Sequence, residues 1–351
     1  MIHPWLQPTW TRLVELGGRL PHALLFVGPS GLGKRELAEA FAARLLCDAP
    51  RPDGHACEQC EPCQWRLGGN HPDLQRVVPA ADAVTSEASG EEGSGAKEGG
   101  KAASSQIVIE QIRALQSSLA VTGHHSARRV AIIDPAEAMN SFTANALLKL
   151  LEEPPAGCTF LLVSSSPRRL LPTIRSRCQQ WSFGRPDAAE LARWRSRTGA
   201  AGEALLALGG GMPLAAERLA AAGGEALLAR FVRDIGPLRA ADALRLAGQW
   251  EQWLKSKEAI AAGFGMPELV DWMQRWVSDL AALRLGGRVR FFPAQDGVLS
   301  ALATRSSIAA VSRCYNDFAQ LRRVSRHPLN ARLFLEDMLL RYARAITGTR
   351  P

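Results

Sequence analysis

The fold of this chain is decided by the stretch Gly28-Pro29-Ser30-Gly31-Leu32-Gly33-Lys34, which is followed by Arg35. Its spacing, G-x-x-x-x-G-K, is that of a phosphate-binding loop. The three glycines let backbone N–H groups approach a phosphate closely, and the lysine reaches the β- and γ-phosphates. The stretch therefore predicts a degenerate nucleotide-binding site.

The site is degenerate because of the residue after the lysine. A phosphate-binding loop normally continues with Ser or Thr, whose hydroxyl binds Mg²⁺. Arg35 stands at that position, and a guanidinium has no acceptor with which to ligate a metal ion. We predict a loop that holds a phosphate, or only keeps its shape, without cleaving a nucleotide. Whether ATP or ADP binds stays open at this point.

The residues around the loop support it. The apolar run from Ala23 to Val27 ends at the loop, as a buried parallel strand would. After the loop, apolar residues recur at helical spacing from Leu37 to Leu45. Strand, glycine loop and helix are the context that the motif requires. A glycine-rich turn without a ligand is the alternative, and this context argues against it.

Length and composition give weaker limits. The chain has 351 residues, enough for two or three domains, and 46% hydrophobic with 22% charged residues is ordinary for a soluble protein. No apolar run approaches the roughly 20 residues of a membrane span, and the N-terminus lacks a signal-peptide pattern. We expect a cytoplasmic protein without a membrane partner. The net charge of +8 suits work near nucleic acid, and equally a basic protein from an arginine-rich proteome.

Four of the seven cysteines lie in one short segment: Cys47, Cys57, Cys60 and Cys63. Their spacing, C-x9-C-x2-C-x2-C, lets four thiolates converge on one tetrahedral ion, which predicts a structural Zn²⁺ site without an open position. An iron–sulfur cluster is the competing interpretation, and disulfides are the poorer one without a secretion signal. His55 and His71 lie nearby but are left out, because four thiolates complete the shell.

The rest of the chain shows a change of organisation. Residues 79–105 are rich in Gly, Ala, Ser and Glu, which predicts a disordered loop inserted into a domain. Further buried strands are expected at 129–134 and 159–163, with a helix over 142–153 between them. Beyond Phe183 the pattern is helical. Alternating strands and helices predict a doubly wound parallel α/β domain followed by helices.

Several smaller features are interpreted as packing. Trp272, Met273, Trp276 and Leu280 lie at helical spacing and predict a core or subunit face. Three isolated cysteines are expected to be buried: Cys158, Cys178 and Cys314. A small basic cluster is interpreted as a solvated helix end, with contact to DNA or an acidic partner as the alternative: Arg322, Arg323 and Arg326.

Four features of the sequence resemble the AAA+ clamp-loader family of bacterial DNA polymerase III, and within it the delta-prime subunits. Residues 144–155 (ANALLKLLEEPP) are similar to the family's helix after the acidic strand, and residues 173–178 (TIRSRC) contain its Ser-Arg-Cys signature. Residues 330–341 (NARLFLEDMLLR) resemble the last collar helix, and the four-cysteine insertion is similar to the family's knuckle. The resemblance spans nearly the whole chain outside residues 79–105.

This resemblance implies a domain plan. The AAA+ nucleotide-binding-like domain, a RecA-like doubly wound parallel sheet, would cover residues 1–182 and contain a zinc knuckle at 47–63. A small helical lid domain would cover 183–235, and an all-α collar domain for oligomerisation would cover 236–351.

Departures from the family pattern suggest that this chain's own site does not hydrolyse ATP. In the family's motor subunits the acidic strand ends in Asp-Glu, and the Glu polarises the attacking water. Here Asp134 is followed by Pro135, and Glu137 stands three positions after the aspartate. Together with Arg35, this removes the usual metal ligand and the usual base.

Two sensor positions are also carried over from the family. The first sensor, Thr or Asn in the motors, falls at Ser165. The second sensor, an Arg in the motors, falls at Pro213. The resemblance therefore implies a site that has lost metal binding, water activation and sensing.

The resemblance assigns catalysis to Arg177 instead. In the family, the arginine of Ser-Arg-Cys projects toward ATP bound on a neighbouring subunit. Such an arginine finger stabilises charge in the transition state and is worth about 10³–10⁵ in rate. An arginine paired with a surface carboxylate is the alternative for Arg177. The neighbouring Ser176 and Cys178 favour the finger.

The implied function is that of a wedge in a clamp loader, at the replisome on the nucleoid. Its partners would be gamma/tau-like ATPases and delta in a hetero-pentamer, the sliding clamp, and primer–template DNA through the assembled complex. An active gamma-like AAA+ motor is the first alternative, and a zinc-dependent nucleic-acid-binding module is the second. A nucleotide kinase would bring neither Ser-Arg-Cys nor a helical C-terminal third.

Overall fold

The computed structural model describes residues 2–80, 104–120, 128–198, 202–325, 327 and 329–347. Of the segment expected to be disordered, residues 81–103 lie outside the described part. The chain divides into two compact units, Met1–Asp187 and Ala188–Pro351, which we describe separately. The expected boundary after 182 and the division after 235 stay predictions.

The first unit is built on a five-stranded sheet in which every neighbouring pair is parallel, in the order β2-β3-β4-β1-β5. The strands are β1 (Ala23–Val27), β2 (Leu74–Val77), β3 (Arg129–Ile133), β4 (Cys158–Ser164) and β5 (Gln179–Ser182). In the register of β1, Phe26 lies opposite Val163 on one side and Trp181 on the other. The predicted parallel α/β sheet is confirmed.

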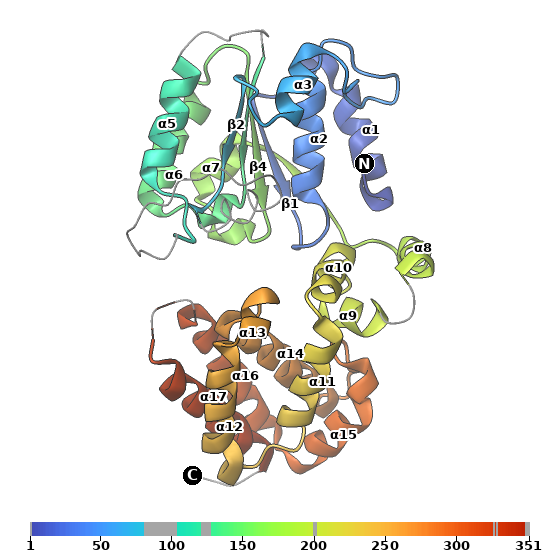
Figure 1. Cartoon of the computed structure of the whole chain (residues 1–351), viewed down its shortest axis with the longest axis vertical. Coiled ribbons are helices and arrows are strands. Elements are labelled where there is room, and N and C mark those ends of the chain that lie inside the picture. The colour runs from blue at the N-terminus through green and yellow to red at the C-terminus, as the bar shows by residue number, and fades with distance from the viewer. Residues whose placement is uncertain are drawn as a thin grey trace. The chain divides into compact units, whose positions relative to one another are not determined.

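Helices cover both faces of this sheet (Figure 1). The picture places α1 and α2 on one side and α5 and α6 on the other. The helices are α1 (Gln7–Glu15), α2 (Lys34–Leu46), α3 (Glu61–Leu67), α5 (Ile109–Ala120), α6 (Ser141–Glu152) and α7 (Pro172–Arg177). Short 3₁₀ turns lie at η1 (Pro4–Leu6), η2 (Gly17–Arg19), η3 (Ala136–Ala138) and η4 (Pro167–Arg169). Because both faces are covered, the central strands are mostly apolar.

The helix α6 has clear start and stop signals. The side chain of Asn140 accepts the backbone N–H of Thr143 at 2.9 Å, as an N-cap does. The helix ends at Glu152, just before Pro154 and Pro155, because proline cannot continue a helix. Its apolar face packs into a core shared with β3, β4, α5 and α7, which includes Leu147.

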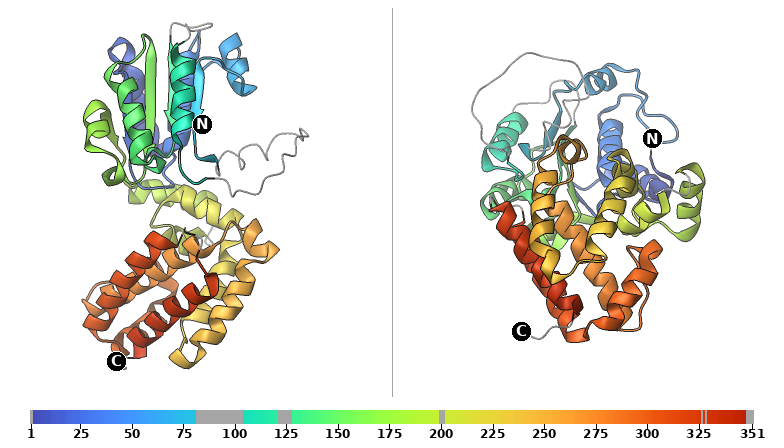
Figure 2. Two further views of the ribbon diagram at one scale, coloured as in Figure 1. Left: turned by 90° about the vertical axis from the view of Figure 1, so that its left-hand side faces the viewer. Right: turned by 60° about the horizontal axis from the view of Figure 1, so that its bottom comes forward.

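The second unit contains only helices among its described residues, as the views in Figure 2 also show. They are α8 (Ala188–Thr198), α9 (Gly202–Leu208), α10 (Pro213–Ala221), α11 (Gly224–Ile235), α12 (Ala243–Leu254), α13 (Lys257–Ala261), α14 (Met266–Arg284), α15 (Asp296–Arg305), α16 (Ile308–Val324) and α17 (Ala331–Thr347); η5 (Ala240–Asp242) and η6 (Pro293–Gln295) are 3₁₀ turns. A helical C-terminal part is therefore confirmed. Within the described residues, no helix has the length and apolar character needed to cross a membrane.

The predicted packing stripe lies in the core of this second unit. Trp272, Met273, Trp276 and Leu280 are at most 3% exposed. The indole N–H of Trp276 donates to the hydroxyl of Tyr342 at 2.8 Å. The interpretation of these residues as core is confirmed.

Candidate functional site

The phosphate-loop motif lies between β1 and α2, as predicted. Gly33 has φ +91°, in the left-handed region that favours glycine, and α2 begins at the next residue, Lys34. Space also restricts Gly28, because a Cβ there would lie 2.8 Å from the carbonyl oxygen of Phe183. Gly31 also has a positive φ of +84°, so this backbone favours glycine at all three glycine positions of the motif.

The side chain of Lys34 is folded into its own loop. Its Nζ donates to the carbonyl oxygens of Gly28 at 2.8 Å and Pro29 at 2.7 Å, and to Oγ of Ser165 at 3.1 Å. An ammonium has three N–H donors, and these three oxygens match them. Lys34 is 4% exposed. The ammonium of the motif is thus bound by oxygens of this chain.

Arg35 forms an ion pair with Asp134, the acid at the end of β3. The Nε of Arg35 donates to Oδ2 of the carboxylate. The Asp134 side chain is 12% exposed, whereas that of Arg35 is 49% exposed. Burial raises the pKa of Asp134, and the neighbouring Arg35 guanidinium opposes that rise. In the motif's usual form the residues at these two positions lie near a shared Mg²⁺. Here the guanidinium of Arg35 pairs directly with Asp134.

Glu137, on η3, lies closer to the loop than its sequence position suggests. Its Oε1 accepts the backbone N–H of Ser165 at 2.9 Å. Its Oε2 is buried without a hydrogen-bond partner among the described residues. Since Ser165 also accepts from Lys34, this serine links the Glu137 carboxylate to the Lys34 ammonium.

Sequence reasoning missed a further contact of the loop, made by the N-terminal segment. The indole of Trp5 donates to the carbonyl oxygen of Leu32 at 2.8 Å. The His3 ring stacks on Trp5 with centroids 4.9 Å apart, and a Cβ at Gly33 would lie 2.6 Å from His3. No spacing rule marks such a segment, because it contacts the loop only through tertiary packing.

Two predicted roles at this site stay predictions. Pro213 is the first residue of α10 and is buried, but it belongs to the second unit. The sensor-like role of Ser165 and the loss of the second sensor at Pro213 both concern a nucleotide, which no contact described above involves.

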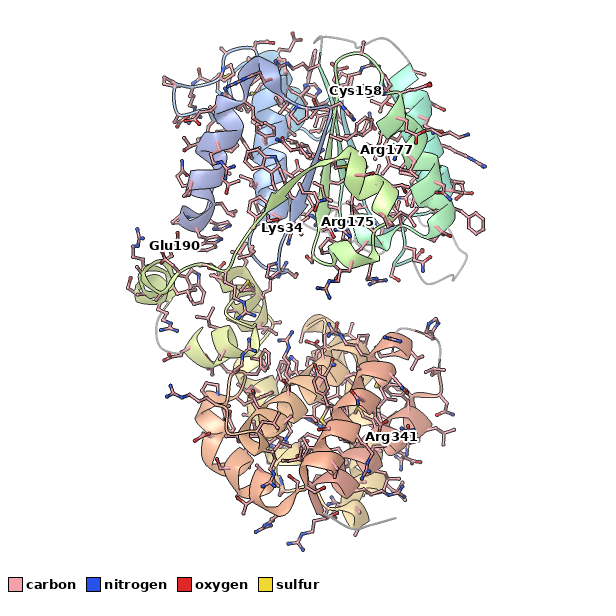
Figure 3. All side chains as sticks on the ribbon, turned by 180° about the vertical axis from the view of Figure 1, so that it is seen from behind. Lys34, Cys158, Arg175, Arg177, Glu190 and Arg341 are labelled. Atoms are coloured by element: carbon pink, nitrogen blue, oxygen red, sulfur yellow. The ribbon has the colours of Figure 1, made fainter. Side chains whose placement is uncertain are left out.

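Arg177 is the last residue of α7, a different element from that of Lys34 (Figure 3). Its Nη2 lies 2.6 Å from Oε1 of Glu152, and its Nη1 donates to the carbonyl oxygen of Thr173 at 3.2 Å. The side chain is 36% exposed. The guanidinium is therefore held at the surface while part of it stays accessible.

The other isolated cysteines behave as packing residues. Cys178, next to Arg177, is 7% exposed, and burial raises its pKa to about 12. Burial also raises the pKa of Cys314 to about 12, and it raises the pKa of Cys158. Thiols that ionise so reluctantly are poor nucleophiles.

One arginine of the small basic cluster has partners within the chain. Arg322 lies 3.2 Å from Asp271 and donates to Gln274 at 3.2 Å. This contact fits the interpretation as a helix end. Arg326 lies outside the described residues.

The four cysteines of the inserted segment meet at one point. Their sulfur atoms all lie within 4.8 Å of one another: Cys47, Cys57, Cys60 and Cys63. The Sγ–Sγ distance is 3.8 Å for Cys47 and Cys60, and 4.0 Å for Cys57 and Cys63. Bonds of about 2.3 Å to a tetrahedral Zn²⁺ would place sulfurs about 3.8 Å apart. The donor set and its spacing fit such an ion, and a possible metal-binding group is confirmed.

Two backbone N–H groups donate to the sulfur of Cys57. Cys57 Sγ accepts from the N–H groups of Gln59 at 3.4 Å and Cys60 at 3.3 Å. These bonds lower the pKa of Cys57 to about 6. Glu58 makes the turn possible with φ +61°, a rare conformation for a residue other than glycine. Burial acts in the opposite direction and raises the pKa of Cys47.

The cysteine segment is anchored to α1. The indole of Trp10 donates to the carbonyl oxygen of Asp53 at 3.1 Å and stacks on His55, with centroids 4.7 Å apart. His55 thus has a packing role, and the metal-binding group does not include it or His71.

The comparisons with known proteins agree with these features. A family model described as "DNA polymerase III, delta subunit" matches residues 10–187. The DNA polymerase III subunit delta' of Pseudomonas aeruginosa is 35% identical to this chain, with 97% of each covered. The DNA polymerase III subunit gamma/tau of Mycobacterium bovis is 34% identical over 166 residues, which are 47% of this chain and 25% of that subunit.

Among solved structures, a DNA polymerase III gamma subunit-related protein of Thermotoga maritima matches with a TM-score of 0.47 and 18% identity, covering 97% of this chain and 99% of that one. The similarity to the Pseudomonas aeruginosa subunit extends along almost the whole chain, whereas the gamma/tau similarity covers less than half of it. This chain therefore belongs to the family of DNA polymerase III delta' subunits.

Proposed function

We propose that this chain is a delta'-type subunit of a clamp loader, which does not hydrolyse ATP at its own site and donates Arg177 to a neighbouring ATPase. Its partners would be gamma/tau-like ATPases and delta in a hetero-pentamer, the sliding clamp, and primed DNA through the complex. Residues 183–235 would form the lid and residues 236–351 the collar. The complex would work in the cytoplasm, at the replisome.

The observation that carries this proposal is the ion pair between Arg35 and Asp134. ATP hydrolysis at a phosphate loop uses Mg²⁺ held near these two positions. The guanidinium already neutralises the buried carboxylate of Asp134 just after β3, and Mg²⁺ would be repelled by it at short range. Lys34 is likewise engaged by oxygens of the loop. A nucleotide would have to break these contacts before it could bind.

Arg177 differs in its partner, because the Glu152 side chain is 48% exposed whereas that of Asp134 is 12% exposed. Its guanidinium is exposed on α7 and retains the planar fork that binds phosphate oxygens with two parallel hydrogen bonds. A positive charge aimed at the γ-phosphate on a neighbour would stabilise the transition state of hydrolysis.

For the four cysteines we propose a structural Zn²⁺. Cys47, Cys57, Cys60 and Cys63 would fill all four positions, so the ion would stabilise the fold of this segment and would have no open position for a substrate. An iron–sulfur cluster would give visible absorption, which makes the two metals easy to distinguish in the purified protein.

An ATPase and nucleotide-binding assay on the purified full chain tests the inert site. We expect no turnover above a buffer control with Mg²⁺-ATP, and no saturable binding of a fluorescent ATP analogue. Turnover that Lys34→Ala abolishes would contradict the proposal and support a gamma-like motor. That alternative rests on Glu137, whose carboxylate reaches Ser165 beside the loop.

A further inference from the structure

We propose that Glu152 is a positioning residue for Arg177, holding the guanidinium in the orientation that meets the neighbour's phosphate. This inference rests on the proposed role of Arg177 as an arginine finger. Glu152 belongs to the Leu-Glu-Glu-Pro-Pro sequence at residues 151–155, and Arg177 belongs to the Ser-Arg-Cys sequence at residues 176–178.

Two contacts fix the plane of the guanidinium. Nη2 of Arg177 lies 2.6 Å from Oε1 of Glu152, and Nη1 donates to the carbonyl oxygen of Thr173 at 3.2 Å. A single contact would let the group turn about that contact, whereas two contacts on different nitrogens do not. An arginine has five N–H donors. These two contacts leave three donors for phosphate oxygens.

The carboxylate is itself held by a rigid element. Glu152 is the last residue of α6, which is capped by Asn140 at its start and stopped by proline at its end. The preceding Leu151 and Leu150 are 2% and 8% exposed and belong to the same core as Ile174 of α7. The positions of both partners are therefore set by one packed core, as preorganisation of a site requires.

The pair is poorly suited to a purely structural role. The Arg177 side chain is 36% exposed and that of Glu152 is 48% exposed. Solvent-exposed ion pairs contribute little to folding stability, because water and salt screen them and their side chains lose freedom. An exposed arginine held by two contacts gains orientation more than it adds stability.

Glu153 offers a matched control. It is the next acid in the chain, it is exposed, and its side chain makes no hydrogen bond or ion pair in the described structure. Neutralising it changes the local charge by the same amount as neutralising Glu152, without touching Arg177.

The test is stimulated ATP hydrolysis by a complex reconstituted from the full chain, its ATPase partners, delta, the clamp and primed DNA. The rate lost with Arg177→Ala defines the share of total ATP hydrolysis that depends on the interface served by Arg177. We expect Glu152→Ala to lower that share about tenfold with unchanged KM for ATP, because small misplacements of a catalytic group reduce kcat strongly. Glu152→Gln should stay within about threefold, because its amide oxygen still accepts from Nη2. Glu153→Gln should leave the rate unchanged.

The outcomes separate the two proposals. If Arg177→Ala leaves hydrolysis unchanged, the finger is wrong and this inference falls with it. If Arg177→Ala lowers the rate but Glu152→Ala leaves it equal or raises it, only the positioning role is contradicted. In the double variant, Glu152→Ala should add nothing to Arg177→Ala. Should Glu152→Ala not assemble, Glu152→Asp, which keeps the charge on a shorter side chain, should lower kcat with unchanged KM; an unchanged kcat would contradict the role.

Discussion

Two arginine–carboxylate pairs in the first unit have the same chemistry and different surroundings. Arg35 pairs with Asp134, whose side chain is 12% exposed, at the phosphate loop. Arg177 pairs with Glu152, whose side chain is 48% exposed, at the end of α7. A charge that is mostly removed from water depends on its partner, whereas an exposed pair exchanges easily with water or another anion.

Under our proposal, this difference explains how one chain can lose a nucleotide site and keep an arginine finger. At the loop, Arg35 pairs with a buried acid, so replacing this arginine with a ligand would be unfavourable. At α7, the arginine is oriented but remains accessible. Under our proposal, the first pair keeps a nucleotide out of the loop, and the second orients an arginine toward a phosphate on a neighbouring subunit.

The largest effect is expected from a substitution in the four-cysteine group, and we expect it to lower hydrogen-exchange protection near the loop more than in α7. A structural zinc site contributes on the order of 10 kcal/mol to its own module. The cysteine segment contacts α1 through Trp10, and the turn that precedes α1 carries Trp5, which contacts the loop. We expect Cys60→Ser to lose the metal and hydrogen-exchange protection at residues 47–63 and in α1.

Metal content and hydrogen exchange measured on the same sample check this prediction. Cys314→Ala, a buried cysteine outside the cluster, is the control and should keep one metal ion per chain. Equal loss of protection at α7 would contradict the separation between the two regions.

A smaller effect is expected from Arg35→Ala, which leaves Asp134 without its cation. Breaking a fully buried pair costs about 3–5 kcal/mol. Because Arg35 is half exposed, we expect about 2 kcal/mol in the free energy of unfolding, measured by urea denaturation. Arg169→Ala, at an exposed arginine, should change it by less than about 0.5 kcal/mol.

The pH dependence of the Arg35→Ala effect sharpens this prediction. Burial raises the pKa of Asp134 in the folded state above its ordinary 3.8, and Arg35 limits that rise. A raised acid pKa means that stability is present below the unfolded pKa and is lost as pH rises through the folded one. Removing Arg35 enlarges the loss, so the destabilisation should be larger at pH 7 than at pH 4. An effect independent of pH would contradict the role of the pair.

The smallest effect is expected on the stability of the exposed pair. Glu152→Ala should change the free energy of unfolding by less than about 1 kcal/mol, because exposed ion pairs contribute about 0–1 kcal/mol. Urea denaturation of this variant beside Glu153→Gln measures it. A decrease in the free energy of unfolding above about 2 kcal/mol would show that the Arg177–Glu152 pair is structural, and it would contradict the contrast with the Arg35–Asp134 pair.

The sequence predicted the central strands and missed the edges of the sheet. β1, β3 and β4 each contain an apolar run of at least four residues, because helices cover both faces of the sheet. β2 and β5 lie at the two edges of the sheet, and their residues, LQRV and QQWS, give no such run. An edge strand is recognisable only once its single neighbour is known.

The sequence identified the residues of the candidate site, but it did not predict which of them contact one another. Spacing alone marked Lys34, Arg35 and the four cysteines. The contact between Arg35 and Asp134 joins residues 99 positions apart, and no local pattern carries that information. The position of Glu137 beside Ser165 was missed for the same reason, because it depends on how β3 and β4 pair.

The central claim is that this chain contributes to hydrolysis through Arg177 on a neighbour's nucleotide. The most direct test compares Arg177→Ala with Arg169→Ala in the reconstituted complex, measuring ATP hydrolysis stimulated by clamp and primed DNA, with assembly checked by gel filtration. An arginine finger is worth about 10³–10⁵ in rate, so we predict that Arg177→Ala removes the whole share of the one interface it serves. Arg169→Ala should leave the rate unchanged. An assembled Arg177→Ala complex that hydrolyses ATP at the unaltered rate would contradict the account.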